Sequence, residues 1–310
     1  MQTRTLRSDA MLLVTAAIWG FAFVAQRVGM DYVGPFTFNA SRFFLGAISL
    51  LPLLLLIKPE PLQAGRDQQV SDQQGGYKKR MPLWLGGFLA GLLLFMGSTF
   101  QQVGLQYTTA GNAGFITGLY IILVPIIALL WGQKTGKHTW FGALLAVLGL
   151  YMLSVTDDFS LAYGDLLQLI GAVFWAGHVL LIGWLSPRMD ALRLSIVQFF
   201  TCGIISLIAA FTTETPEIGS IIEAWQPIAY AGLLSVGVAY TLQVFAQKEA
   251  PASHAAIILS LEAVFAVIGG YLFLNELLTM KGLMGCGLML AGMLVSQFEP
   301  KSKHQVETAH

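Results

Sequence analysis

Long apolar stretches recur along the whole chain and are separated by shorter polar segments. A helix needs about 20 residues to cross the hydrocarbon core of a bilayer, so a window of about 19 residues is the natural measure. Ten stretches fit it, and most of the connections between them are short turns rich in Gly, Pro, Asn or Asp. We expect ten membrane-spanning helices, at residues 9–28, 35–57, 83–106, 110–131, 139–155, 163–185, 191–211, 225–247, 251–274 and 280–298.

The connection at residues 58–81 differs from the short turns. It contains two prolines, five glutamines and the glycine pair Gly75-Gly76, and it ends in the basic run Lys78-Lys79-Arg80 followed by Met81. A segment so poor in apolar residues cannot bury enough surface to fold by itself. We expect a flexible, solvated loop at residues 58–81.

The composition indicates that the apolar stretches lie in lipid and not in a soluble core. Charged residues make up 11% of the chain, against about a quarter in soluble domains. Hydrophobic residues make up 55%, and the mean hydropathy is +0.68. A soluble protein of 310 residues could not bury so much apolar surface. The expected fold class is an all-α polytopic membrane protein.

Charge and cysteine content exclude several other classes. The formal net charge is zero, which gives no sign of a nucleic-acid partner. Cys202 and Cys286 both lie inside apolar stretches, so they imply neither a disulfide framework nor a metal cluster. No phosphate-binding loop, catalytic triad or metal-ligand spacing is present, and we expect no cofactor and no metal.

Basic residues are divided unequally between the two sides of the predicted bundle. If the ten helices alternate in direction, fourteen Lys and Arg residues fall on the side of the termini. Only Arg27 and Lys281 fall on the opposite side, and Arg42 lies within a span. Cytoplasmic loops carry the excess of Lys and Arg. Both termini and the loop at residues 58–81 are therefore expected in the cytoplasm.

The two halves of the sequence resemble each other. At an offset of 156 residues, Asp9 falls on Asp165, Trp19 on Trp175 and Arg42 on Gln198; at an offset of 141, Gln102 falls on Gln243. The matches keep the same order along both halves. Each half holds five predicted helices, an odd number, so the second half enters the membrane upside down relative to the first. Such inverted repeats are typical of secondary transporters.

Particular runs of residues resemble the EamA-type branch of the drug/metabolite transporter superfamily. They are Ala16-Ala17-Ile18-Trp19-Gly20, Arg42-Phe43-Phe44, Leu261-Glu262-Ala263-Val264-Phe265-Ala266 and Leu274-Asn275-Glu276, with the closing glycines Gly282, Gly285 and Gly292. The resemblance covers residues 9–298. It implies one EamA-like repeat at residues 9–155 and a second at residues 163–298.

The same resemblance implies a function. Relatives of this type are ten-helix exporter-type carriers of amino acids and other small metabolites. It also implies a central cavity lined by the helices at 9–28, 83–106, 110–131, 163–185, 225–247 and 251–274. The chain departs from the family where Glu262-Ala263 stands in place of the frequent Glu-Pro. The matching site in the first half is Val124-Pro125.

Six polar or aromatic residues are candidates for substrate binding. Trp19 and Trp175 are related by the repeat, and His178 lies one turn after Trp175. Gln102 and Gln243 form a second repeat-related pair, with Tyr240 one turn before Gln243. Amide groups in lipid must find polar partners, so these faces should point inward. The alternative for each residue is a packing role: a satisfied core histidine, a structural tryptophan, or an amide that holds two helices together.

Three ionisable residues are candidates for coupling or gating. A charge at the centre of a membrane helix costs about 2.5–3.5 kcal/mol on insertion scales, so each needs a reason. Glu262 should lie near the midplane, with His254 eight positions earlier. Glu262 could bind a proton or a substrate ammonium, or it could be a neutral acid that orients its helix. Arg42 could bind a carboxylate, lock a gate, or reach the membrane surface by snorkelling.

The sequence therefore predicts a secondary transporter, and more narrowly an exporter. Its cargo would be a small polar metabolite, such as an amino acid, moved by alternating access around a midplane cavity and with protons as a candidate coupling ion. We expect no enzymatic activity, and we expect the protein in a prokaryotic plasma (inner) membrane. The alternatives are a membrane-embedded enzyme, which would need a catalytic constellation at one depth, and a non-transporting scaffold.

Overall fold

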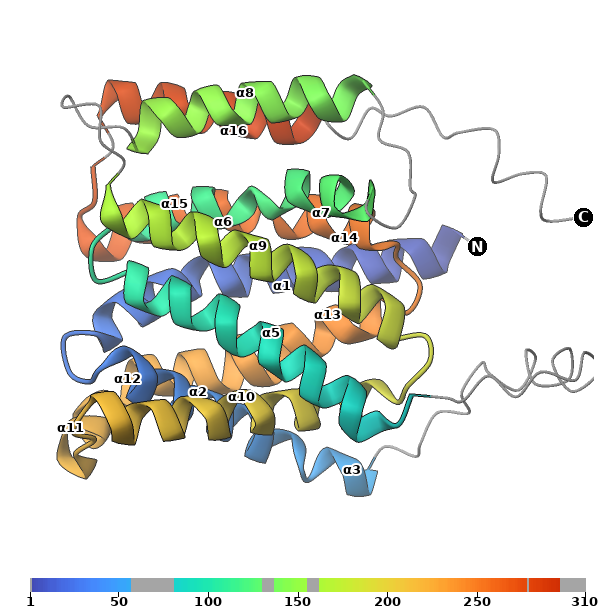
Figure 1. The fold of residues 1–310 in the computed structure, drawn as a ribbon, viewed down its shortest axis with the longest axis vertical. Coiled ribbons are helices and arrows are strands. Elements are labelled where there is room, and N and C mark those ends of the chain that lie inside the picture. Colours follow the sequence, from blue (N-terminus) through green and yellow to red (C-terminus); the bar gives the residue numbers. More distant parts are fainter. Residues whose placement is uncertain (1, 57–80, 130–136, 155–161, 278, 296–310) are drawn as a thin grey trace, which may run out of the picture.

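The computed structural model describes residues 2–56, 81–129, 137–154, 162–277 and 279–295, and every regular element in them is a helix (Figure 1). Apart from Met81, the loop predicted at residues 58–81 lies outside the described residues. The helices of the first half are α1 (Gln2–Gly29), α2 (Pro35–Leu50), α3 (Leu53–Leu56), α5 (Leu83–Gly104), α6 (Ala110–Gly118), α7 (Tyr120–Ala128) and α8 (Lys137–Ser154).

The second half is divided into more elements, because the segment at 225–246 is split into three. Its helices are α9 (Tyr163–Leu185), α10 (Ala191–Thr213), α11 (Ile218–Glu223), α12 (Trp225–Ala229), the π-helix η2 (Tyr230–Tyr240), α13 (Thr241–Ala246), α14 (Ala252–Leu259), α15 (Glu262–Leu274) and α16 (Met280–Val295).

Eight helical segments in the described part of the chain are long and apolar enough to cross a membrane. They correspond to eight of the predicted spans: Leu6–Gly29, Pro35–Leu56, Leu83–Gly104, Ala110–Ala128, Tyr163–Leu185, Ala191–Thr213, Trp225–Ala246 and Ala252–Leu274. At the predicted spans 139–155 and 280–298 the apolar helices are shorter, Trp140–Gly149 and Met280–Gly292. Large apolar side chains such as Phe211 and Phe273 are exposed on the outside, as lipid-facing surfaces require.

Helices from the two halves pack against each other throughout the bundle. The main contacts are α2 with α10, α5 with α9 and α10, α1 with α15 and η2, α6 with α15, and α7 with α9. The helices α8 and α16 pack together and form one edge of the molecule (Figure 1). The α1–α15 contact is close because Gly20 has no side chain. A Cβ there would lie 2.7 Å from the Glu262 carbonyl oxygen and would also overlap Phe265.

Two of the spanning segments are interrupted in the middle by a tight turn. The break between α6 and α7 is at Leu119 (ψ −14°), and the break between α14 and α15 is at Ser260 and Leu261 (ψ −15° and −13°). Both use i→i+3 bonds of the 3₁₀ type, such as Ile122 N–H to Leu119 O at 2.9 Å and Ala263 N–H to Ser260 O at 3.1 Å. Proline is not required, since only the first segment contains one, Pro125.

Each break is followed directly by a side chain that becomes important below. Tyr120 is the first residue of α7 and Glu262 is the first residue of α15. By position relative to the turn, the counterpart of Glu262 in the first half is therefore Tyr120. The pairing of Glu262-Ala263 with Val124-Pro125, suggested by the sequence, is four residues out of step.

The segment at 225–246 is widened by the π-helix η2. Its carbonyls accept hydrogen bonds from α1: Trp19 Nε1 donates to Ser235 O (3.3 Å) and Thr15 Oγ1 to Ala239 O (3.1 Å). In the reverse direction, the Tyr230 hydroxyl donates to Ile18 O (3.1 Å). Wide turns of this kind are frequent at functional sites. They bring α1 and η2 together along one wall of the site described next.

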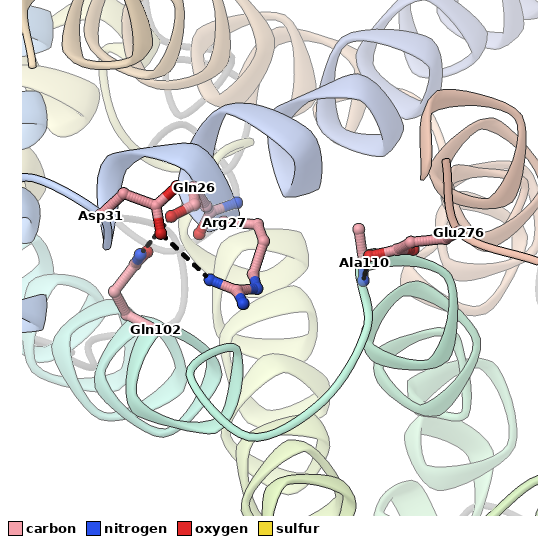
Figure 2. A network of polar contacts seen from close by, with 6 residues as sticks. All are labelled: Gln26, Arg27, Asp31, Gln102, Ala110 and Glu276. Carbon is pink, nitrogen blue, oxygen red and sulfur yellow. Dashed lines mark hydrogen bonds and ion pairs between the residues drawn. The ribbon is translucent and has the colours of Figure 1, made fainter. Parts of the chain in front are cut away.

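Two carboxylates bind helix N-termini at the end of the bundle where α1 ends and α2 begins. Glu276 accepts hydrogen bonds from the backbone N–H groups of Ala110 (2.9 Å) and Gly111 (3.1 Å), at the start of α6 (Figure 2). Glu214 accepts from Phe36 N–H (2.8 Å) and Thr37 N–H (2.9 Å), at the start of α2. Such contacts are favourable because helix N-termini carry a partial positive charge. They join α15 to α6 and α10 to α2.

Candidate functional site

A cavity lies among α1, α2, α5, α6, α7, α9, η2, α13 and α15, and both halves of the chain supply its walls. The space between its lining atoms is about 430 Å³, a figure that includes the part open to solvent. The lining residues are Trp19, Ala22, Phe23, Gln26, Arg42, Gln101, Thr117, Tyr120, Trp175, His178, Val179, Ser235, Tyr240, Gln243 and Glu262.

Aromatic rings form the centre of the cavity wall. The ring of Tyr240 lies 4.4 Å from that of Trp19 and 6.1 Å from that of Trp175, between centroids, and it stacks on Trp175 at 24°. The His178 imidazole meets Tyr240 edge-on, at 6.2 Å and 88°. Trp19 comes from α1, Trp175 and His178 from α9, and Tyr240 from η2. The cluster therefore joins α1, α9 and η2 on a common surface.

Many polar atoms on this wall have no hydrogen-bond partner among the described residues. Seven lining residues carry such a buried atom: Gln26, Arg42, Tyr120, Trp175, His178, Gln243 and Glu262. Buried polar groups in proteins are nearly always paired, with protein or with ordered water, so each of these seven needs a partner. A polar molecule entering the cavity would supply the missing partners.

Arg42 is almost fully buried, with 1% of its surface exposed. Its Nε donates to Asn39 Oδ1 at 3.0 Å, and its guanidinium lies 4.9 Å from the centroid of the Phe43 ring. No ion pair joins it to an acidic side chain in the described part of the chain, and its Nη2 has no partner. One interpretation of the sequence was that Arg42 reaches the membrane surface by snorkelling. In the structure its side chain instead stays buried inside the bundle.

Glu262 is also buried, with 4% of its surface exposed. The hydroxyl of Tyr120 lies beside its carboxyl group, but the geometry falls short of a hydrogen bond, and both the hydroxyl and Glu262 Oε1 are without a partner in the described residues. The aromatic ring of Tyr240 lies near the charged groups of both Glu262 and Arg42. The cavity therefore holds a cation and a carboxyl that are not paired with each other.

The structure brings most of the predicted site residues together. Trp19, Trp175, His178, Tyr240 and Gln243 line the cavity, and so do Arg42 and Glu262. Gln102 lies outside the lining: it is fully buried, and its Nε2 donates to Gln26 O at 3.1 Å, joining α5 to α1 (Figure 2).

His254 lies elsewhere. Its Nε2 is 2.8 Å from Asp9 Oδ1, so it joins the start of α14 to α1. Its side chain is 42% exposed, and it is not part of the cavity lining. A continuous helix would have put His254 and Glu262 on one face, but the turn at Ser260 and Leu261 separates their helices.

Sequence reasoning passed over several lining residues. Gln101 was not selected from the sequence, because the four-residue spacing of Ser98, Gln102 and Gln106 indicated that a different face of the helix points inward. Gln26 and Thr117 lacked a repeat partner that would have drawn attention to them. Tyr120 could have been found by aligning the two mid-helix turns, which place it opposite Glu262.

The comparisons with known proteins agree with one another. The model of the EamA-like transporter family matches the chain in two segments, residues 6–155 and 162–297. An uncharacterised transporter of Archaeoglobus fulgidus is 34% identical over 294 residues, which cover 94% of this chain and 86% of the relative. The uncharacterised transporter YoaV of Bacillus subtilis is 24% identical, covering 93% of this chain and 95% of the relative.

More distant similarities extend the comparison. A chloroplastic WAT1-related protein of Arabidopsis thaliana is 25% identical, covering 90% of this chain and 67% of the relative. A solved crystal structure superposes with a TM-score of 0.64 at 18% identity, covering 94% of this chain and 96% of that one; this likeness concerns the fold alone. Several apolar helices, transporter relatives and a family match over nearly the whole length leave one conclusion: this integral membrane protein belongs to the EamA-like transporter family.

Proposed function

We propose that this chain is a secondary transporter that moves a small polar metabolite, such as an amino acid, by alternating access around the cavity. The observation that carries the proposal is the cavity itself: it is lined from both halves of the chain, and seven of its residues have buried polar atoms without a partner among the described residues. A scaffold would gain nothing from unpaired polar groups, because each costs about 1–3 kcal/mol.

We propose further that the bundle has ten spans built as two inverted repeats, residues 9–155 and 163–298. The family model matches twice, once in each half. The helix contacts also follow a repeat pattern. If each helix of one half is exchanged for its counterpart, the α1–α15 contact becomes α9–α7, the α1–α14 contact becomes α9–α6, and the α5–α10 contact becomes η2–α2; all of these contacts exist. On this proposal α8 and α16 are counterparts and cross the membrane despite their shorter apolar stretches.

The predicted orientation follows from the distribution of charge. With both termini in the cytoplasm, the fourteen basic residues of that side satisfy the positive-inside rule. The end of the bundle that holds Glu214 and Glu276 would then face away from the cytoplasm. We propose that the membrane is a prokaryotic plasma membrane and that the direction is export.

Glu262 is the proposed site of proton coupling. It is the one acidic side chain in the cavity lining, and its Oε1 lacks a partner. A carboxyl group in such a place can exist neutral or charged, depending on whether the cavity holds water, a cation or neither. Two protonation states linked to two openings of the cavity are what proton-coupled transport needs.

The experiment is uptake by proteoliposomes that contain the purified chain. Labelled amino acids, nucleosides and organic cations are tested one at a time, with and without a pH gradient, against empty liposomes. The proposal expects saturable uptake of at least one amino acid that responds to the gradient. Uptake of none of the compounds above the level of empty liposomes, by protein that remains folded and monodisperse, would overturn it.

A further inference from the structure

We infer that Arg42 forms an anion-binding subsite that holds the carboxylate of the transported molecule. The inference rests on the proposed transport function and names the chemical feature that the cavity selects. The cargo would carry its carboxylate at Arg42 and a hydrogen-bond donor, such as an ammonium group, toward Glu262.

A buried guanidinium without an acidic partner is expensive. A charge at membrane depth is costly, so such residues normally pair with one another or with backbone carbonyls. Arg42 has an uncharged acceptor, Asn39 Oδ1, on its Nε and an aromatic face at Phe43. These contacts fix the direction of the side chain but do not neutralise its charge. The remaining donor, Nη2, has no partner among the described residues.

The surroundings of Arg42 suit an organic anion. The nearby ionisable groups, Tyr240 and Cys202, are neutral at ordinary pH. The planar fork of a guanidinium matches a carboxylate in a bidentate arrangement. Because Arg42 is already held by Asn39 and Phe43, little side-chain freedom would be lost when the anion binds.

The opposite charge stands farther along the same cavity. Arg42 follows Pro35 by seven residues, so it lies about 10 Å from the start of α2 by helix rise. Glu262 lies at the mid-helix turn of its own segment. The side chain of Tyr240 lies near both Arg42 and Glu262. A small molecule lying along the aromatic wall would therefore meet a cationic group at one end and a carboxyl group at the other.

The test is ligand binding to the full-length protein in lipid nanodiscs, measured by thermal unfolding and by equilibrium dialysis. The probes are L-serine, L-methionine, L-leucine and L-phenylalanine, each paired with its carboxamide, which keeps the ammonium group and removes the negative charge. Sodium chloride and sodium phosphate test inorganic anions. The variants are Arg42→Gln, Arg42→Lys and the control Arg27→Gln, whose arginine is 37% exposed and paired with Asp31 outside the cavity.

We expect at least one carboxylate to stabilise the wild type and the Arg27→Gln control, while its carboxamide does not. Arg42→Gln should bind that carboxylate at least tenfold more weakly, and Arg42→Lys should lie in between because it keeps the charge but loses the fork. Ligand-free Arg42→Gln should unfold at the same or a higher temperature than the wild type. A purely structural arginine would instead lower the unfolding temperature and leave the carboxylate preference unchanged.

Three results would overturn the inference: carboxamides binding as well as carboxylates, Arg42→Gln binding as tightly as the wild type, or no carboxylate binding at all. Stabilisation by chloride or phosphate as strong as by the carboxylates would assign Arg42 to an inorganic anion and overturn its role toward the cargo. Arg42-dependent binding without uptake in proteoliposomes would leave the subsite standing and refute transport. Uptake that is equally fast for carboxylates and carboxamides would support transport and refute the subsite.

Discussion

The two halves of the cavity share a scaffold and differ in charge. Arg42 in α2 has Gln198 in α10 as its counterpart at an offset of 156, and Glu262 after the second mid-helix turn has Tyr120 after the first. Gln198 Oε1 accepts a hydrogen bond from His178 Nε2 at 2.9 Å, whereas Arg42 has no acidic partner in the described part of the chain. Each half therefore contributes one ionisable group and one neutral counterpart.

This difference suggests that the similar packing of the two halves and their differing charges have separate roles. Two similar halves can exchange conformations at little cost, which is the basis of alternating access in inverted-repeat carriers. A single small cargo has no such symmetry, so its binding groups must differ between the halves. The packing around the cavity should then be sensitive in both halves, while the chemistry should be sensitive only at the charged member of each pair.

The largest effect is expected from adding volume at Gly20. Its counterpart is Ala176, which already carries a methyl group, but a Cβ at Gly20 would overlap α15 at Phe265 and at the Glu262 carbonyl. Gly20→Leu should destabilise the protein by about 3 kcal/mol, the upper range for overpacking, and should greatly reduce the yield of monodisperse protein. Gly287→Leu is the matched control, because nothing lies within 4 Å of that Cβ position. Equal stability of the two variants would show that α1 and α15 are not in close contact.

The next effect concerns the charged member of the pair Tyr120 and Glu262. Glu262→Gln keeps the size and hydrogen-bonding capacity of the side chain but cannot titrate, so the response of uptake to a pH gradient should fall at least tenfold, about 1.4 kcal/mol. Tyr120→Phe should reduce uptake only a few-fold and leave its pH profile in place. Both are measured in proteoliposomes.

The control for that pair is Glu249→Gln, the same substitution at an exposed position. It should transport like the wild type. Wild-type kinetics with an unchanged pH profile in Glu262→Gln would refute proton coupling at this residue and leave orientation of α15 as its role. A stronger effect of Tyr120→Phe than of Glu262→Gln would reverse the comparison between the two halves.

Some features of the fold and of the cavity follow from local sequence patterns, whereas others depend on tertiary packing. Eight of the spans followed from hydropathy, because a lipid environment needs long apolar helices. Trp19, Trp175 and Tyr240 were found from helical spacing and repeat offsets, which place residues on faces. His254 was grouped with Glu262 because that reasoning assumes an unbroken helix. The 3₁₀ turns and the π-helix shift the register, and they depend on tertiary packing that no local pattern encodes.

A smaller effect is expected at the end of the bundle that holds the carboxylate caps. Glu276 accepts from two N–H groups of α6, whereas the positions equivalent to Glu276 and Glu214 in the first half hold Lys134 and Lys58. A glutamine can offer only one oxygen and no charge, so Glu276→Gln should weaken the α15–α6 contact by about 1 kcal/mol. The cavity should then open more often at this end.

Thiol labelling measures that opening. Gln26→Cys, a cavity-lining position, is introduced after Cys202 and Cys286 have been replaced by serine, and a membrane-impermeant reagent is added from the side opposite the termini. Glu276→Gln should raise the labelling rate by up to about fivefold, which is the Boltzmann factor for about 1 kcal/mol. The exposed residue Glu223 gives the control Glu223→Gln, with no change expected. Faster labelling in the control alone would show that the caps do not close this end.

The smallest effect is expected from Pro125, and it tests whether the two mid-helix turns share a cause. A proline inside a helix removes one backbone hydrogen bond and bends the helix near the residue four positions earlier, which would be Ile121. The turn lies at Leu119, and the second half makes the same turn with Val267 at the corresponding position. Pro125→Ala should therefore keep the turn, change stability by less than about 1 kcal/mol and leave uptake within twofold of the wild type. Hydrogen exchange of the segment 116–123 provides the direct measurement and should be unchanged. Strong new protection there, together with slower uptake, would mean that proline sets the break in the first half while packing sets it in the second.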